Sequence, residues 1–248
     1  MTLIVCLRGK DGMVLASDSR GTFGDPRGVT AQNDNMQKVY PVSKYVGVLL
    51  AGSGELGAMV INEIQKEIGT RRTEGVTPVM GLIREILIKK FDEWFKGFLI
   101  QPVQGSTSPV RPNLVLIAGG YDLNGEGKPT IQRIYHLNCF VNFAPFLIDY
   151  GFALEGLPQY ALYLLNRLYN PDSSVKNLLP LAAYVITETA SQDGKVGGPV
   201  QMIKILPDVG CVTLNSEEIN KITESNNDRS KNLKTSFFGS AENVPSKS

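Results

Sequence analysis

The residues with the clearest capacity for chemistry lie at the start of the chain. Thr2 follows the initiator Met1, and cells usually remove a methionine that precedes so small a residue. The exposed threonine would carry a hydroxyl and a free α-amine, and an amine with a pKa of about 7.7–8.0 can take the hydroxyl proton at neutral pH. Many proteins begin with Met-Thr without using the threonine, so the hypothesis that Thr2 is a nucleophile depends on its neighbours.

Three further residues could support such a nucleophile. Asp18 ends the second strand of a predicted hairpin, so it can lie beside the start of the first strand. Lys38 precedes another predicted strand. An ammonium next to Thr2 would lower the pKa of the hydroxyl and keep the amine neutral, and Asp18 would hold that ammonium charged and aimed. Gly52 follows a strand, and a glycine lets a backbone N–H come close to a developing oxyanion.

Other kinds of catalytic site have little support in the sequence. His136 is the only histidine, which excludes multi-histidine metal sites and makes a Ser-His-Asp or Cys-His mechanism unattractive, so we interpret it as structural. Three cysteines without a CxxC pair, Cys6, Cys139 and Cys211, argue against a disulfide framework or a zinc site and favour a reducing compartment, the cytoplasm. Phosphate-loop, nucleophile-elbow and metalloprotease motifs are also missing from the sequence, so we expect no metal and no cofactor.

The composition is that of an ordinary globular protein. The 248 residues are 42% hydrophobic and 20% charged, which suits one or two domains with a large core. Lys plus Arg is 25 and Asp plus Glu is 24, a net charge of +1, so nothing favours a nucleic acid or an anionic membrane as a partner. The longest apolar stretches are far shorter than the ~18–20 residues of a membrane-spanning helix, and we recognise no secretory signal.

The order of the predicted elements indicates a layered fold. Strand patterns recur at residues 3–8, 13–17, 39–42, 45–50, 114–121, 131–137, 146–152, 200–206 and 210–214. Helical periodicity covers residues 55–71, 157–169 and 174–190, and a further helix is expected to begin with Thr77 as its N-cap before Pro78. Strands interrupted by paired helices favour sheets packed between helical layers over an alternating βαβ fold. Residues 22–35 suggest a loop or irregular edge. The polar residues 215–248 suggest a largely disordered extension after a domain of residues 2–214.

Several of these segments together resemble a known family. They are TLIV at 2–5, GKDGMVLASDSR at 9–20, QKVYPV at 37–42 and Ala51-Gly52. They resemble the β-type subunits of the 20S proteasome and the simpler bacterial HslV-type and other proteasome-homologue peptidases. The spacing from Thr2 to Asp18 matches without a gap, and Lys38 needs a loop a few residues longer than usual. The element order over 2–214 matches the family's four-layer αββα sandwich, in which two mainly antiparallel sheets lie between helix pairs.

The resemblance implies an N-terminal-nucleophile hydrolase. Thr2 would be the nucleophile with its amine as base, Lys38 and Asp18 would tune both groups, and the Gly52 N–H would form the oxyanion hole. Arg20 and Thr22 match positions that support the site and bind the substrate backbone. The family's specificity pocket corresponds here to small or apolar residues, namely Gly21, Met36, Leu50, Gly54 and Ala58. Such a pocket would favour apolar side chains just before the scissile bond.

Two positions depart from the family's pattern. Leu154-Glu155-Gly156 stands where the family has a Gly-Ser-Gly turn before a helix, so a carboxylate replaces the hydroxyl that bonds near the terminal amine. Glu155 could raise the pKa of that amine and weaken it as a base, it could relay the proton itself, or it could be a solvated loop carboxylate. In the later Asp-x-x-Ser-Gly-Gly motif, Asp193 and the glycines are present and Val196 replaces the serine.

From these features we expect a threonine-type peptidase that cuts peptide bonds through an acyl-enzyme on Thr2. Family members assemble into self-compartmentalising particles, so we expect a homo-oligomeric ring or coil. Its substrates would be peptides or unfolded proteins, supplied by an ATP-dependent unfoldase. Two alternatives stay open. The chain could be a non-catalytic ring or scaffold subunit, or a transpeptidase (protein ligase) that passes the threonyl ester to another amine instead of to water.

Overall fold

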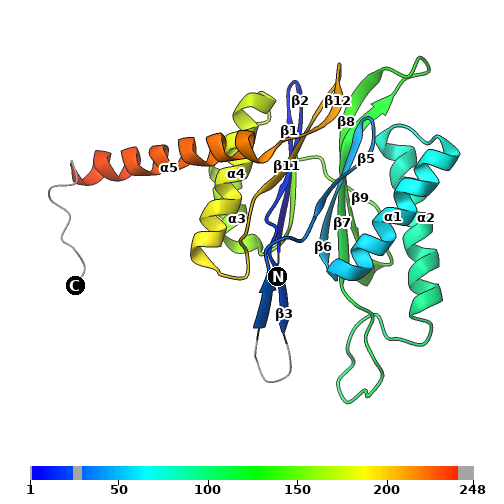
Figure 1. Cartoon of the computed structure of the whole chain (residues 1–248). Helices are drawn as coiled ribbons and strands as arrows, with labels where there is room; N and C mark the ends of the chain where they lie inside the picture. The colour runs from blue at the N-terminus through cyan, green and yellow to red at the C-terminus, as the bar shows by residue number, and fades with distance from the viewer. Residues whose placement is uncertain (1, 25–29, 240–248) are drawn as a thin grey trace.

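Two five-stranded sheets lie face to face at the centre of the molecule, with a pair of helices on the outer face of each (Figure 1). The computed structural model describes residues 2–24 and 30–239 of the chain. Every strand pair in the two sheets is antiparallel. The predicted four-layer αββα sandwich is therefore confirmed.

The first sheet carries the start of the chain and has the strand order β10-β1-β2-β11-β12. Its strands are β1 (Leu3–Gly9), β2 (Gly12–Ser17), β10 (Phe152–Gly156), β11 (Gln201–Leu206) and β12 (Gly210–Thr213). The predicted hairpin of β1 and β2 is present, with Ile4 opposite Ser17. This register brings the residues just after β2 next to the residue that precedes β1.

The second sheet has the order β5-β6-β7-β8-β9. Its strands are β5 (Val39–Ser43), β6 (Val46–Gly52), β7 (Leu114–Leu123), β8 (Pro129–Asn138) and β9 (Phe146–Leu147). A 3-10 turn, η1 (Cys139–Val141), follows β8. A separate hairpin of β3 (Gly21–Gly24) and β4 (Thr30–Asn33) forms where the sequence suggests a loop or irregular edge. Residues 25–29 of that segment lie outside the described residues.

Alternation along the strands divides the core into two kinds of layer. Ile4, Cys6 and Leu15 point between the sheets, whereas Leu3 and Val5 point toward the helices of the first sheet. Cys6 is fully buried, and a Cβ on Gly119 of the facing sheet would lie 2.8 Å from its sulfur. Burial raises the pKa of the Cys6 thiol far above its ordinary value. Cys6 is thus a small core residue, as the sequence suggests.

Four helices cover the sheets. They are α1 (Gly54–Arg71) and α2 (Val76–Trp94) on the second sheet, and α3 (Pro158–Leu168) and α4 (Val175–Gln192) on the first. Helix α2 has Gly75 as its N-cap, so the prediction for Thr77 is wrong; the Thr77 hydroxyl instead donates to Asp122 at 3.0 Å. The single strand predicted over 146–152 is also wrong, because β9 and β10 belong to different sheets. Among the described residues no helix is both long and apolar enough to cross a lipid bilayer.

The polar segment after β12 differs from the expected disordered extension, because it forms helix α5 (Ser216–Phe238), which extends beyond the rest of the molecule (Figure 1). Asn215 and Glu218 form a capping box at its start. Ile219 is buried against the core of the first sheet, and the Asn226 amide donates to the Pro180 carbonyl of α4 at 2.9 Å. The few contact residues are spaced along a helix that is polar on average, so the composition of the segment does not reveal them. Residues 240–248 lie outside the described residues.

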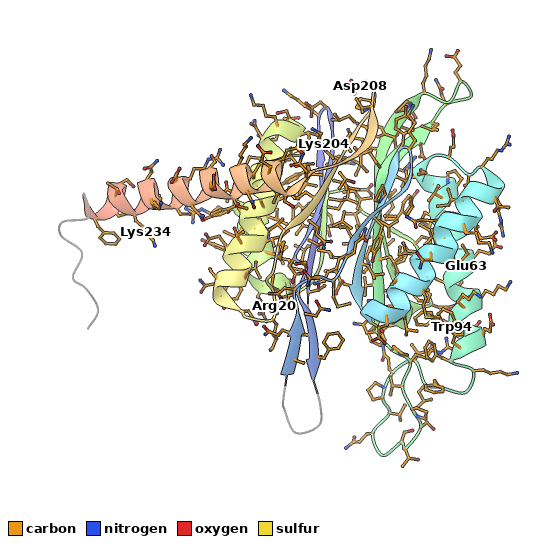
Figure 2. The ribbon with its side chains drawn as sticks, in the orientation of Figure 1. Arg20, Glu63, Trp94, Lys204, Asp208 and Lys234 are labelled. Carbon is orange, nitrogen blue, oxygen red and sulfur yellow. The ribbon has the colours of Figure 1, made fainter. Side chains whose placement is uncertain are left out.

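Figure 2 shows how the side chains fill the sandwich and where its two ends lie. Lys204 and Asp208 mark one end, and Arg20 marks the other, next to the β3–β4 hairpin. The start of β1, the residues after β2 and the end of β6 all reach the Arg20 end. Residues from both sheets can therefore share one site there.

The contact between α5 and α4 depends on Asn226. We predict that Asn226→Ala loosens α5, because it removes the hydrogen bond to Pro180, worth about 0.5–1.5 kcal/mol. Hydrogen exchange followed by mass spectrometry should show faster exchange in peptides from 216–238, while the sheets keep their protection. Asn227→Ala, at the exposed neighbouring position, is the control and should leave exchange unchanged. Equal exchange in the two variants would contradict this packing.

Candidate active site

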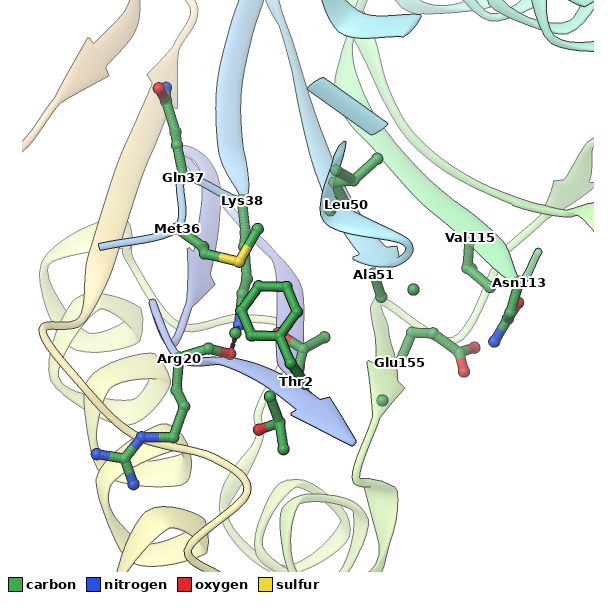
Figure 3. Close-up of a pocket in the computed structure, with 16 residues that line it drawn as sticks. Thr2, Arg20, Met36, Gln37, Lys38, Leu50, Ala51, Asn113, Val115 and Glu155 are labelled. Carbon is green, nitrogen blue, oxygen red and sulfur yellow. Dashed lines mark hydrogen bonds between the residues drawn. The ribbon is translucent and has the colours of Figure 1, made fainter. Parts of the chain in front are cut away.

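A cavity of about 430 Å³ opens at the Arg20 end of the sandwich, between the two sheets (Figure 3). Its walls contain residues from separate parts of the chain, including Thr2, Lys38, Gly52 and Glu155. Thr2 and Glu155 belong to the first sheet side, and Gly52 ends β6 of the second sheet. The cavity thus joins the predicted nucleophile to the predicted oxyanion position.

Asp18 is the centre of the polar contacts behind this cavity. Its side chain is fully buried. Its Oδ1 accepts the Thr2 hydroxyl at 2.8 Å, the Leu3 N–H at 2.9 Å and the Lys38 ammonium at 2.7 Å. Its Oδ2 accepts the backbone N–H groups of Arg20 at 3.2 Å and Gly197 at 3.1 Å. One buried carboxylate therefore orders five donors, which compensate for the loss of its hydration.

Thr2 packs against the backbone of β10. It is 7% exposed, and the adjacent β1 residue Leu3 lies opposite Gly156 of β10. Gly156 has a φ of +104°, and a Cβ at this position would collide with the Thr2 carbonyl oxygen. The glycine is needed both for this backbone conformation and for the close approach of β10 to Thr2.

Lys38 reaches Thr2 through Asp18. Its Nζ donates to Asp18 Oδ1 and also to the Arg20 carbonyl at 2.7 Å. Burial lowers the pKa of Lys38 below its ordinary value, and the charge of Asp18 opposes this shift. Among the residues that the structure describes, no direct hydrogen bond joins Lys38 to Thr2. The sequence predicts an ammonium next to the Thr2 hydroxyl. In the structure, the Lys38 ammonium and this hydroxyl donate to the same oxygen, Asp18 Oδ1.

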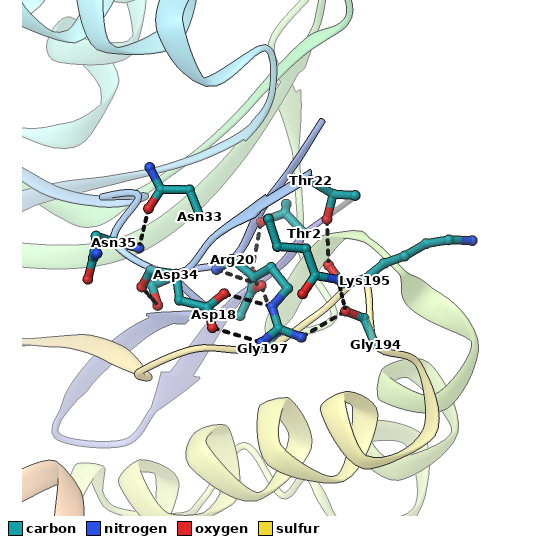
Figure 4. A network of polar contacts seen from close by, with 12 residues as sticks. Thr2, Asp18, Arg20, Thr22, Asn33, Asp34, Asn35, Gly194, Lys195 and Gly197 are labelled. Atoms are coloured by element: carbon teal, nitrogen blue, oxygen red, sulfur yellow. Dashed lines mark hydrogen bonds and ion pairs between the residues drawn. The ribbon is translucent and has the colours of Figure 1, made fainter. Parts of the chain in front are cut away.

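Arg20 is a supporting residue in this arrangement (Figure 4). Its guanidinium forms two bonds to Asp34, at 2.7 and 2.8 Å, and a third to the Gly194 carbonyl at 2.9 Å. The nearby Thr22 hydroxyl lies 3.5 Å from the Lys195 carbonyl. Arg20 and Thr22 both line the cavity, and both contact the loop that delivers the Gly197 N–H to Asp18. Their support for the site is therefore indirect.

The opposite wall of the cavity is small or apolar. Gly52 has a φ of +101°, and a Cβ there would collide with the Asn113 carbonyl oxygen. The Met36 side chain fills the space beside Gly21 and Gly54. Four of the five residues predicted for the specificity pocket line the cavity, namely Gly21, Met36, Leu50 and Gly54.

Ala58 does not join them, so its predicted place in the pocket is wrong. It lies on the exposed face of α1. The buried position of that turn is Gly57, against which the Leu50 side chain packs. The phase of the helix therefore turns Ala58 away from the cavity.

The two positions that depart from the family's pattern behave differently. Val196 is 1% exposed in the core between the first sheet and its helices, so it presents no group to the cavity. Asp193 is not among the cavity-lining residues; its carboxylate accepts the Lys195 N–H at 2.9 Å and shapes the turn after α4. Glu155 does line the cavity, from the end of strand β10 and not from a solvated loop.

Several residues of the site escaped sequence reasoning. Asp34 and Asn113 lie in polar segments without a distinctive pattern, and only the fold brings them to Arg20 and Gly52. His136 contacts the Glu155 carboxylate, with 3.0 Å between Nε2 and Oε2. It could be singled out as the only histidine of the sequence, although nothing in the sequence indicates its partner. Within residues 2–24 and 30–239, no group of three His, Cys, Asp or Glu side chains could hold a metal ion.

Comparisons with known proteins point to one protein family. Residues 2–115 match the protein family described as proteasome subunit. Proteasome subunit beta 1 of Streptomyces avermitilis is 29% identical to the chain, over 86% of this chain and 69% of that protein. Proteasome subunit beta of Nanoarchaeum equitans is 26% identical, over 83% of this chain and 93% of the relative.

A solved structure shares the fold. It is a Gly-1 mutant of Anbu from Hyphomicrobium sp. strain MC1, with a TM-score of 0.66 over 96% of this chain and 99% of that chain. At 16% sequence identity, this likeness concerns the arrangement of the sheets and helices alone.

The buried pair of Lys38 and Asp18 leads to a stability prediction. Lys38→Met should lower the free energy of unfolding by about 3–5 kcal/mol, because it leaves the Asp18 carboxylate buried without a cation. Combining it with Asp18→Asn should recover part of the loss. Urea unfolding at pH 7 measures both effects. Lys10→Met, at an exposed turn, is the matched control, and equal stability of the two lysine variants would contradict the pairing.

Proposed function

We propose that this chain, a member of the proteasome β-subunit-like family, is a peptidase whose nucleophile is the hydroxyl of Thr2. The observation that carries the proposal is the bond from Thr2 Oγ to Asp18 Oδ1, an oxygen that also accepts the Lys38 ammonium. A threonine that merely filled space would not need a buried ion pair at its hydroxyl, since burying two charges is costly.

The reaction begins once Met1 has been removed. The Thr2 amine takes the proton of its own hydroxyl, and Oγ attacks the carbonyl carbon of the scissile peptide bond. The tetrahedral intermediate collapses as the C–N bond breaks, and the protonated amine returns its proton to the leaving nitrogen. An ester on Thr2 remains. Water, deprotonated by the same amine, then attacks the ester and releases the acid product and the free hydroxyl.

Asp18 and Lys38 make the first step easier. The Lys38 charge balances Asp18, so this carboxylate orients the hydroxyl without becoming a strong base. The positive charge behind Oγ stabilises the developing alkoxide in a site with little water. The backbone at Gly52, on the opposite wall, is the group we assign to the oxyanion.

The proposal extends to assembly and supply. Proteasome β subunits form ring assemblies, and we propose that copies of this chain form a homo-oligomeric ring or coil that encloses the sites. Peptides and unfolded proteins are the substrates, delivered by an ATP-dependent unfoldase. The three free cysteines suit the reducing conditions of the cytoplasm.

One observation favours a second candidate, a non-catalytic ring or scaffold subunit. Val196 replaces a serine of the family's pattern and lies in the core, so no hydroxyl reaches the site from that turn. Retention of Met1 in the mature protein would support this candidate, because an acylated nitrogen cannot act as the base.

Substitution of Thr2 tests the nucleophile. Thr2→Ala should reduce peptide hydrolysis by at least about 10³-fold, because the attacking oxygen is lost, whereas Thr2→Ser keeps an oxygen and should retain measurable activity. Fluorogenic peptides measure both rates. Thr70→Ala, on the exposed face of α1, is the control and should leave the rate unchanged. The proposal fails if Thr2→Ala cleaves the peptides as fast as the wild type.

The lining of the cavity leads to a prediction about substrates. Met36, Leu50, Gly21 and Gly54 provide an uncharged wall, so cleavage should be fastest after apolar residues, by roughly tenfold or more over charged ones. A panel of fluorogenic peptides that differ only in the residue before the scissile bond measures this preference. Fastest cleavage after Arg or Asp would contradict the assignment of these residues to the specificity pocket.

A further inference from the structure

Glu155 presents a problem for the proposed function. Its carboxylate lines the same cavity as Thr2, and its neighbour Gly156 packs directly on the Thr2 backbone. A free carboxylate so placed would pair with the Thr2 ammonium and make the amine a poorer base. Some feature of the chain must keep the two groups apart if the amine is to take a proton.

His136 is the group that contacts this carboxylate. It lies on β8 of the second sheet, and its Nε2 is 3.0 Å from Glu155 Oε2. The bond to His136 is the main cause that holds the pKa of Glu155 below its usual value, against the effect of burial. Glu155 is therefore ionised at neutral pH and can only accept, so the His136 Nε2–H is the donor.

The contact crosses from one sheet to the other. Glu155 lies opposite Ile4 of β1, and His136 lies opposite Ile117 of β7; both isoleucines belong to the core between the sheets. The side chains of Glu155 and His136 are 32% and 21% exposed. Figure 3 shows the Glu155 carboxylate turned toward Asn113, away from Thr2. The histidine thus draws the carboxylate to the far side of the cavity.

Other charged groups near Glu155 already have partners. Across the cavity, Lys38 is paired with Asp18 and Arg20 with Asp34. β6 and β7, with Asn113 just before β7, contribute to this wall the uncharged residues Ala51, Gly52, Asn113 and Val115. Cys6 of β1 is buried, and its raised pKa keeps it neutral. Helix α3, on the other face of β10, carries Arg167 at its last turn. Within the described chain, His136 is the one charged or titratable group bonded to Glu155.

We propose that His136 is a positioning residue, which holds the Glu155 carboxylate on the Asn113 side of the cavity and so leaves the Thr2 amine free to act as a base. The inference rests on the proposed function, since it concerns the same amine. It gives the chain's only histidine a role through Glu155 and without contact to the substrate. It also explains how an acid can occupy a position where the related family has a hydroxyl.

A double-mutant comparison tests the proposal. The protein is prepared without a polyhistidine tag and with ¹³C-labelled threonine, and the titration of the Thr2 amine is followed by NMR. His136→Leu releases the carboxylate, so the midpoint of the amine should rise by roughly half a unit to one unit. His136→Gln keeps an N–H donor and should stay near the wild type. Adding Glu155→Gln to His136→Leu should abolish the rise.

Two results would overturn the proposal. One is an unchanged midpoint in His136→Leu; the other is a rise that persists when Glu155 is also replaced. Glu126→Gln, on an exposed turn, controls for the loss of a carboxylate elsewhere. Intact mass shows beforehand whether Met1 has been removed. A protein that retains Met1 contradicts the proposed function, whereas an unchanged midpoint in a protein without Met1 contradicts the role of His136.

A measurement on the unmodified protein guards against a variant that does not fold. In ¹⁵N-labelled protein, the single histidine gives one imidazole pattern, which reports where its proton lies. We expect the neutral ring to carry its proton on Nε2 in the wild type, because that nitrogen donates to Glu155. In Glu155→Gln this preference should weaken. A wild-type ring protonated on Nδ1 would contradict the arrangement.

Discussion

The arrangement of this site depends on the burial of one carboxylate. Asp18 has no access to solvent, so its charge must be met by donors from the protein. Those donors come from Thr2, Leu3, Arg20, Lys38 and Gly197. Each therefore has one favourable position, and Thr2 is fixed beside the first sheet. A loosely attached terminus could not present a nucleophile reproducibly.

The second sheet contributes to the cavity wall opposite Thr2. Gly52 and the apolar residues around Met36 form the wall that faces Thr2, and the paired sheets set the width of the cavity between them. Glu155 and His136 make a polar contact across that gap, next to the cavity. The same contact therefore joins the two halves of the site and determines where the acid of the pocket lies.

The sequence predicts those parts of the fold and of the site that depend on local pattern. The β1–β2 hairpin and the constellation of Thr2, Asp18 and Lys38 follow from spacing near the start of the chain, and the paired helices follow from helical periodicity further along it. It failed where a property belongs to packing. The phase of α1 turns Ala58 outward, the buried face of α5 is hidden by a polar composition, and the partner of His136 lies on another sheet. Such contacts have no signature in a single chain.

The central claim is that Thr2 carries both a free amine and a reactive hydroxyl. The most direct test is the intact mass of the purified protein before and after treatment with a β-lactone or an epoxyketone, followed by peptide mapping. We predict a starting mass without Met1 and a single adduct on Thr2 that is absent from Thr2→Ala. A protein that retains Met1, or one that forms no adduct on Thr2, would contradict the account.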